Sequence, residues 1–274
     1  MNDTTTVTGS TLRVPDGELH HERRGCGPLV VLVGAPMDAH PFAGLADLLA
    51  PDHTVLTTDP RGINRSRLDD PEQASTPEQR ADDLARLIRH ADAGPAVVLG
   101  SSGGAVSALA LAQAEPGLCR VVIAHEPPLT RLLDDHEDLR AKTEDIIATH
   151  RAGDPLAAGR KFLALANLDL PEEFILQMYG GSRTPQEVAD ADYQNNHMLR
   201  PTTAWVPDLD ALRASPVRLL VGLGEDSTGE LCERTSLALA AALSTTPTYF
   251  PGGHVGFAED PTAFATRLRE VLAG

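Results

Sequence analysis

Short apolar runs rich in β-branched residues alternate along this chain with segments of helical periodicity. This alternation constrains the fold more than any other feature, because it is typical of parallel strands that are connected by helices. It predicts an α/β fold whose mostly parallel sheet is flanked by helices. The predicted strands are residues 28–33, 53–58, 96–99, 120–124, 217–221 and 246–250, preceded by a polar hairpin at residues 11–24.

Helical patterns fill the intervals between these strands. The helix predicted at residues 77–91 carries its leucines and Ile88 on one face, and Thr76 is its candidate N-cap. Residues 105–115 are nearly all small or apolar, as expected of a helix buried against a sheet. Further helices are predicted at residues 236–243 and 261–272.

The alternation breaks between residues 127 and 208, where helical and charge-rich patterns occur without a convincing strand. A helical insertion between two strands of a parallel sheet forms a natural lid. We therefore predict a core domain at residues 1–126 and 209–274, with a helical cap at residues 127–208. Some apolar cap residues are candidates to line a pocket, although most would pack cap helices together: Leu163, Leu165, Phe174, Ile175, Met178, Tyr179 and Trp205.

Composition limits the partners of the chain. Its 274 residues carry a formal net charge of −16, which repels phosphate backbones and anionic lipid, so neither nucleic acid nor a membrane is expected. No apolar run approaches the ~18 residues of a membrane span, and the first residues do not resemble a secretory signal. The three cysteines, Cys26, Cys119 and Cys232, are odd in number and far apart, so they fit neither a disulfide framework nor a CxxC metal site. A cytoplasmic protein without bound metal is the expectation.

The strongest local signal is Gly100-Ser101-Ser102-Gly103-Gly104, which follows a predicted strand and precedes a predicted helix. This is the G-x-S-x-G pattern and context of a nucleophile elbow. Such a sharp turn strains its central residue and requires small neighbours. Ser102 is therefore the candidate nucleophile, whereas Ser101 occupies the variable position.

A serine nucleophile needs an adjacent base, and in the elbow order this base is a histidine near the end of the chain. His254 is the only histidine after His197, and it lies in a glycine-rich loop between the last predicted strand and helix. An oxyanion hole needs two backbone N–H groups. We assign them to Gly103 and Ala35, because the next residue, Pro36, has no N–H.

Four motifs together resemble the α/β-hydrolase superfamily over nearly the whole chain. They are the loop from Gly34, Asp59-Pro-Arg-Gly-Ile-Asn-Arg-Ser66, the elbow at Ser102 and the Pro-Gly-Gly-His254 loop. Asn64 replaces a glycine of the second motif, a mild change because asparagine tolerates left-handed backbone. The resemblance implies the α/β-hydrolase fold with an inserted cap. Serine rather than aspartate at the elbow favours acyl transfer.

The acid that would orient His254 has two candidates. The superfamily usually places an aspartate after the strand at 217–221, but Ser227 holds that position and Asp226 falls one residue early. Some members carry the acid after the strand that follows the elbow helix, where Glu126 lies. The register favours Glu126 slightly, and Asp226 stays open.

The expected activity is hydrolysis of a carboxylic ester or lactone of a small, partly apolar molecule through an acyl-enzyme, without a cofactor. A natural-product cyclase or lyase, a small-ligand binder and a cofactor-free perhydrolase are alternatives, and a homodimer stays open. The candidate substrate contacts are Gly34, Pro36, Met37, His125 and Trp205.

Overall fold

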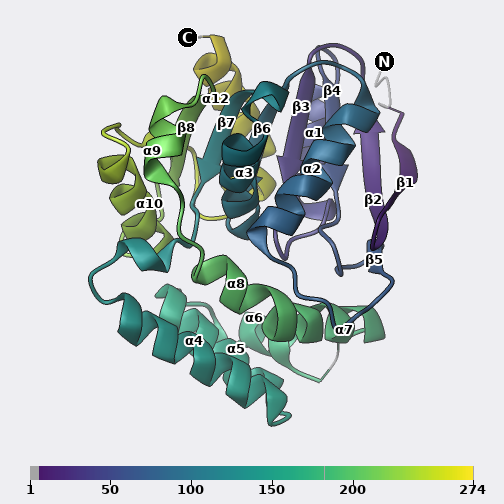
Figure 1. Ribbon diagram of the computed structural model, residues 1–274. Coiled ribbons are helices and arrows are strands. Elements are labelled where there is room, and N and C mark those ends of the chain that lie inside the picture. The colour runs from purple at the N-terminus through teal and green to yellow at the C-terminus, as the bar shows by residue number, and fades with distance from the viewer. Residues whose placement is uncertain (1–5, 182, 274) are drawn as a thin grey trace.

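The computed structural model describes residues 6–181 and 183–273, and these form one nine-stranded sheet with helices on both faces (Figure 1). The sheet order is β1-β2-β4-β3-β6-β7-β8-β9, with β5 pairing on β2. Strands β1, β2 and β5 pair antiparallel, and all pairs from β4 to β9 are parallel. The strands are β1 (Thr8–Val14), β2 (Gly17–Arg24), β3 (Leu29–Val33), β4 (Thr54–Thr58), β5 (Arg67–Leu68), β6 (Ala96–Ser101), β7 (Cys119–His125), β8 (Arg218–Gly224) and β9 (Thr248–Phe250).

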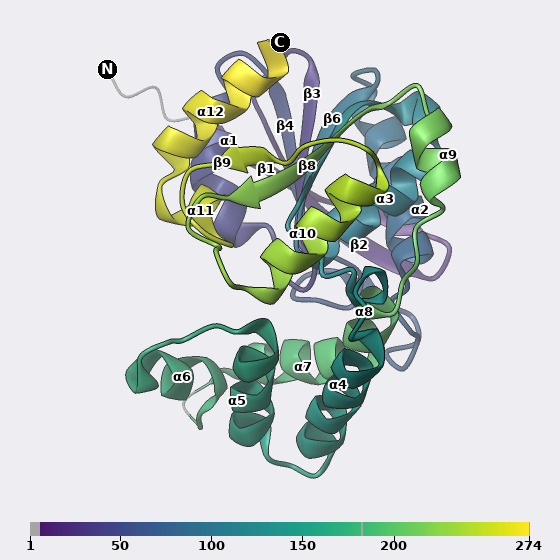
Figure 2. The ribbon, with the colours of Figure 1, turned by 90° about the vertical axis from the view of Figure 1, so that its left-hand side faces the viewer.

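Two apolar clusters fix the layers on either side of the sheet. One cluster joins the sheet to helices α2, α3, α9 and α10, and the other joins it to α1, α11 and α12 (Figure 2). Strands β3, β4 and β6 are buried along their whole length, which explains the continuous apolar sequence of β3 and of the first four residues of β6. These helices are α1 (Ala43–Leu49), α2 (Pro77–Ala91), α3 (Gly103–Ala114), α9 (Leu209–Ala214), α10 (Leu231–Ala242), α11 (Gly256–Glu259) and α12 (Pro261–Ala273).

A helical segment enters between β7 and β8 and lies below the carboxyl ends of the parallel strands (Figures 1 and 2). It contains α4 (His136–Arg151), α5 (Pro155–Ala166), α6 (Glu172–Tyr179), α7 (Pro185–Tyr193) and α8 (Leu199–Thr203), with a short π-helix at Gln194–Met198. Since the connections after β3, β6, β7 and β9 emerge at the same edge, the segment covers the place where they meet. None of the helices in the described ranges is long and apolar enough to cross a membrane.

The predicted α/β fold and its order of strands and helices are confirmed. Helix α2 has the predicted bounds, and Thr76 caps it by accepting a hydrogen bond from the Gln79 amide. Helix α10 begins at Leu231, five residues earlier than predicted, and α1 was not predicted. Asn64 adopts the left-handed backbone expected of it, with φ of 50°, and its amide side chain donates to Asp38.

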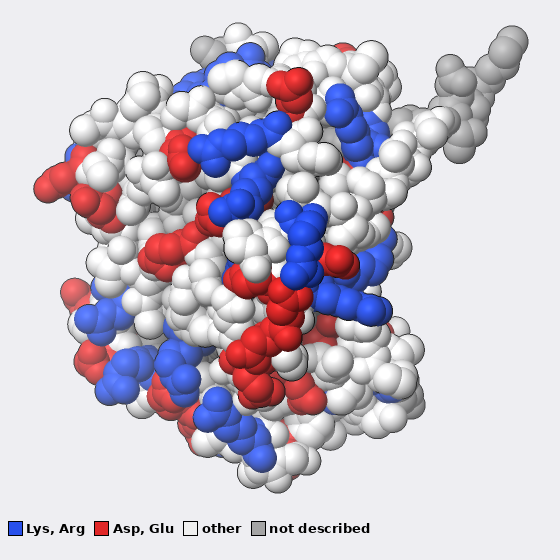
Figure 3. Space-filling model, turned by 45° about the vertical axis from the view of Figure 1, so that its right-hand side comes forward, with Lys and Arg blue, Asp and Glu red and all other residues white. Residues whose placement is uncertain are grey.

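A buried ion pair fixes the turn after β4 to helix α2. The Arg61 guanidinium donates to both carboxylate oxygens of Asp83, at 2.7 and 2.8 Å, and also to Asp16. Arg61 and Asp83 are 3% and 5% exposed. Elsewhere charged side chains are mostly exposed, and both signs intermingle on the face shown in Figure 3. Because the Arg61 pair is buried, removing one partner would leave an uncompensated buried charge, which costs more than breaking an exposed pair.

We expect Asp83→Asn to lower the free energy of unfolding by about 3 kcal/mol, because it leaves the buried Arg61 charge only partly compensated. The neighbouring Asp82→Asn is the matched control, since Asp82 forms an exposed pair with Arg86 and should cost about 0.5 kcal/mol. Urea unfolding of both variants measures the difference. Equal losses in the two variants would contradict this account.

Candidate active site

Ser102 lies at the tip of a strained turn between β6 and α3. Strand β6 ends at Ser101 and α3 begins at Gly103, which leaves Ser102 with φ of 55° and ψ of −125°. A side chain at Gly100 would collide with the Gly104 carbonyl, and one at Gly104 with the Val33 carbonyl. The glycines therefore allow the turn to form, and they hold Ser102 at the N-terminus of α3.

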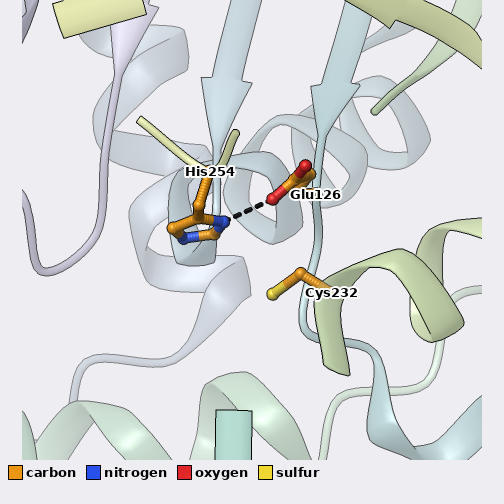
Figure 4. A group of neighbouring side chains, drawn as sticks. All are labelled: Glu126, Cys232 and His254. Carbon is orange, nitrogen blue, oxygen red and sulfur yellow. Dashed lines mark hydrogen bonds and ion pairs between the residues drawn. The ribbon is translucent and has the colours of Figure 1, made fainter. Parts of the chain in front are cut away.

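Glu126 lies directly after β7, the neighbouring strand, and is fully buried. His254 Nδ1 and Glu126 Oε2 are 2.5 Å apart, so the imidazole donates to the carboxylate (Figure 4). The other oxygen, Oε1, accepts from the Gly224 amide at 2.8 Å and from Ser227 Oγ at 2.5 Å. Three donors therefore fix the orientation of one buried carboxylate, and that carboxylate fixes the imidazole.

The electrostatics of this pair favour its charged states. Burial by itself would raise the pKa of Glu126, but the His254 hydrogen bond, the nearby imidazoles and Ser227 together lower it to about 2. Burial also lowers the pKa of His254, yet the Cys232 sulfur and the Glu126 carboxylate outweigh burial and raise it above its ordinary value. Glu126 is thus an anion near pH 7, and it stabilises a proton on His254.

Asp226, the alternative acid, forms no hydrogen bond or ion pair with His254, whose carboxylate partner among the described residues is Glu126. The Asp226 side chain is exposed, and its amide donates to the Gly252 carbonyl at 3.1 Å. Ser227, at the position where the superfamily places its acid, donates to Glu126 instead. The position after β8 therefore supports the carboxylate that comes from the end of β7.

Ser102 and His254 line the same cavity, of about 110 Å³. Ala35 and Gly103 line it too, and within the described residues neither amide N–H donates to a protein acceptor. The remaining walls are mostly apolar and come largely from the helical segment: Pro36, Pro128, Phe162, Leu165, Ala166, Leu168, Gln194, Met198, Leu199, Thr202, Thr203, Glu230, Leu231 and Cys232. The cavity thus joins a hydroxyl, an imidazole and two free amides to an apolar wall.

A larger and more polar cavity of about 550 Å³ adjoins the first, and Pro36, Phe162 and Gln194 line both. Met37 and Asp38 of the loop after β3 form part of its wall, as do Phe174, Met178 and Tyr179 of the helical segment. Gln194 and Met198, which line the smaller cavity, are the first and last residues of the π-helix, an irregularity that often occurs at functional sites.

The structure places three of the predicted substrate contacts, Gly34, His125 and Trp205, outside the lining of both cavities. The space beside the Gly34 Cα is filled by Met37, so this glycine serves the loop and lines neither cavity. The fully buried His125 ring packs edge-on against three phenylalanines, and its Nδ1 lies 3.2 Å from Ser101 Oγ. Trp205 belongs to the core beside α3 and donates through Nε1 to Glu78.

Burial also decides the charge of His125, because it lowers the pKa of this imidazole to about 4. The ring is therefore neutral near pH 7 and serves the packing of the sheet. Of the apolar residues proposed in the cap, Leu165 lines the smaller cavity, whereas Leu163 and Ile175 line neither.

Sequence reasoning missed the contributions of Ser227, Phe162 and Cys232. Ser227 was noted only as the residue that displaces the expected acid. Cys232 belongs to the first turn of α10, a turn that the sequence pattern did not reveal. Phe162 lies in α5, whose helical pattern does not show which side faces the sheet.

Comparison with known proteins agrees with this geometry. Residues 29–267 match the model of the Alpha/beta hydrolase family. The chain belongs to this family. It is also 32% identical to "Uncharacterized hydrolase YraK" of Bacillus subtilis (strain 168), with 97% of both chains covered. The α/β-hydrolase assignment from the four motifs is therefore confirmed.

Two further similarities also extend over nearly the whole chain. The chain is 26% identical to "Zearalenone hydrolase" of Bionectria ochroleuca, covering 96% of this chain and 97% of that protein. The structure of a thermophilic esterase from Thermogutta terrifontis aligns with a TM-score of 0.68 at 24% identity, covering 98% of each chain. The second similarity concerns the fold alone. Membership of this family thus supports an enzyme of the hydrolase class.

Proposed function

We propose that this α/β-hydrolase cleaves a carboxylic ester or lactone of a small, partly apolar molecule through an acyl-enzyme on Ser102. The observation that carries the proposal is the 2.5 Å pair of His254 and Glu126, because the imidazole of this pair lines the same cavity as Ser102. A buried carboxylate on Nδ1 leaves Nε2 of the imidazole free to accept a proton. That is the arrangement which an otherwise inert serine requires.

The proposed reaction follows from these positions. Ser102 Oγ attacks the carbonyl carbon while His254 Nε2 takes the hydroxyl proton, and Glu126 stabilises the resulting imidazolium. The Gly103 and Ala35 amides donate to the oxyanion. His254 then passes its proton to the leaving alcohol oxygen. Water, activated by the same imidazole, attacks the acyl carbon and releases the acid and Ser102.

The two cavities suggest how a substrate is divided. The smaller one has about the size that accommodates a benzene-sized group, and its wall is mostly apolar. We assign the acyl group to it. The larger cavity contains His150, Asp190 and Gln177 among its lining residues and suits a more polar alcohol part. Phe162 lies where the two parts would meet, because it lines both cavities, as do Pro36 and Gln194.

Labelling with a fluorophosphonate and turnover of p-nitrophenyl esters test this proposal together. We expect a single phosphonyl adduct on the wild-type protein and none on Ser102→Ala, measured by intact mass. We also expect kcat/KM for the butyrate to exceed that for the dodecanoate by roughly 10-fold or more, because the longer chain overfills the acyl cavity. Phe162→Ala, which joins the cavities, should narrow this difference.

The alternatives give other results. A protein that takes no label and turns over no ester would instead be a ligand binder, a cyclase or a lyase. Labelling at Ser102 with peracid formation from acetate and hydrogen peroxide, but without ester hydrolysis, would identify a perhydrolase.

A further inference from the structure

Three residues with metal-binding side chains meet at the candidate active site. The donor atoms of Glu126, Cys232 and His254 all lie within 4.8 Å of one another. Figure 4 shows the Cys232 side chain, from the first turn of α10, beside the Glu126–His254 pair. Cys232 is a free thiol, and it lines the cavity together with His254. The acyl-transfer mechanism assigns it no role.

A thiolate, an imidazole and a carboxylate form a ligand set that suits Zn²⁺ and its softer analogue Cd²⁺. Tetrahedral Zn²⁺ with bonds of about 2.0–2.3 Å places its ligand atoms roughly 3.3–3.8 Å apart. The present spacing requires small movements, chiefly an opening of the 2.5 Å contact between Nδ1 and Oε2. Three protein ligands leave a fourth position free for water.

The surroundings favour such a site. Gly224 and Ser227 donate to the Glu126 oxygen that does not contact His254, so the carboxylate is already held in place. Hydrogen bonds of this kind around a ligand strengthen metal binding. The cavity in front of Cys232 and His254 offers the ion a route from solvent.

We propose that Glu126, Cys232 and His254 form an inhibitory site for a thiophilic divalent cation, Zn²⁺ or Cd²⁺. On binding, the Cys232 thiol releases its proton to solvent and the sulfur becomes a thiolate ligand. If the ion binds Nδ1, the imidazole proton moves to Nε2, and if it binds Nε2, the lone pair there is occupied. In both cases His254 cannot accept a proton from Ser102.

The sequence expectation of a protein without metal rested on the lack of a CxxC spacing. These ligands are more than 20 residues apart in every pair, and the ends of β7 and β9 and the start of α10 bring them together. The cation site itself does not depend on the proposed hydrolysis. Only its inhibitory effect rests on that function.

Titration of the full chain with Cd²⁺ tests the site directly, because a thiolate ligand gives an ultraviolet charge-transfer band. We expect a band that saturates at one Cd²⁺ per chain, persists in Cys26→Ser and disappears in both Cys232→Ser and Cys232→Ala. Cys26 is exposed, which makes it the matched control thiol. A wild-type chain without the band, or a band that survives in the folded Cys232 variants, would overturn the proposal.

Ester turnover gives the second readout. We expect Zn²⁺ to inhibit the wild-type enzyme reversibly, with recovery on adding a chelator, and the inhibition constant to rise at least ~10-fold in Cys232→Ser relative to Cys26→Ser. Equal inhibition constants in the two variants would contradict the role of Cys232. If Cd²⁺ binds but no ester is hydrolysed, the cation site stands and the proposed function fails.

Discussion

Replacing Ser102 with alanine is expected to lower kcat for p-nitrophenyl butyrate by roughly 10⁶-fold. The hydroxyl is the atom that would bond to the acyl carbon, so its loss leaves only binding and oxyanion stabilisation. Those residual effects still give a rate of ~10³–10⁴ over water. Steady-state kinetics measures the loss, after the rate of ester hydrolysis without enzyme has been subtracted.

Ser101→Ala is the matched control for this experiment. Ser101 is fully buried and lies beside His125 on the far side of the turn, away from the cavity. Its loss leaves the His125 nitrogen without a partner, so we expect a cost of about 1–3 kcal/mol in the free energy of unfolding. Turnover by the folded protein should remain. If both variants keep turnover, the proposed nucleophile is wrong.

Much of this site could be predicted because each reactive residue lies in the connection that follows a parallel strand. Parallel strands place their carboxyl ends at one edge of the sheet, so a serine after β6 and a histidine after β9 had to approach one another. The glycines around Ser102 added a local signature of strain. The sequence therefore predicted the fold, and it predicted that Ser102 and His254 share a cavity although they lie about 150 residues apart.

The position of a side chain above or below the sheet was harder to predict. His125 and Glu126 are adjacent, yet one ring lies among phenylalanines and one carboxylate reaches His254. In a sheet buried on both faces, polarity does not reveal which face a residue takes. The deciding feature is the backbone of Glu126, whose φ of 54° turns it out of the strand direction.

The cavity wall was beyond sequence reasoning for a related reason. Phe162 and Met198 come from helices whose apolar faces pack both against each other and toward the sheet. Periodicity indicates an apolar face, but not its partner. Trp205 was assigned to the cap for the same reason, and it lies in the core because the chain has already returned to α3 at that point.

The second large effect on kcat is expected at Glu126, the candidate acid that contacts His254. We expect Glu126→Gln to lower kcat by about 10⁴-fold, since an amide in place of the carboxylate can donate to Nδ1 and so favours the tautomer with the proton on Nε2. A neutral amide also no longer stabilises the imidazolium. The shape is conserved, and Gly224 and Ser227 can still donate to the amide oxygen, so the fold should survive.

Asp226→Asn also removes one carboxylate charge, but from an exposed side chain, and should change kcat by no more than about twofold. Comparing the two variants at one pH, with thermal unfolding to verify the fold, separates a carboxylate that orients His254 from one that merely lies near it. The Cys232 site adds an independent measure, because Glu126→Gln should also weaken Cd²⁺ binding whereas Asp226→Asn should not. A greater loss in Asp226→Asn would mean that the 2.5 Å pair is not the one that operates during turnover, since only a rearranged loop after β8 could bring that exposed carboxylate to the imidazole.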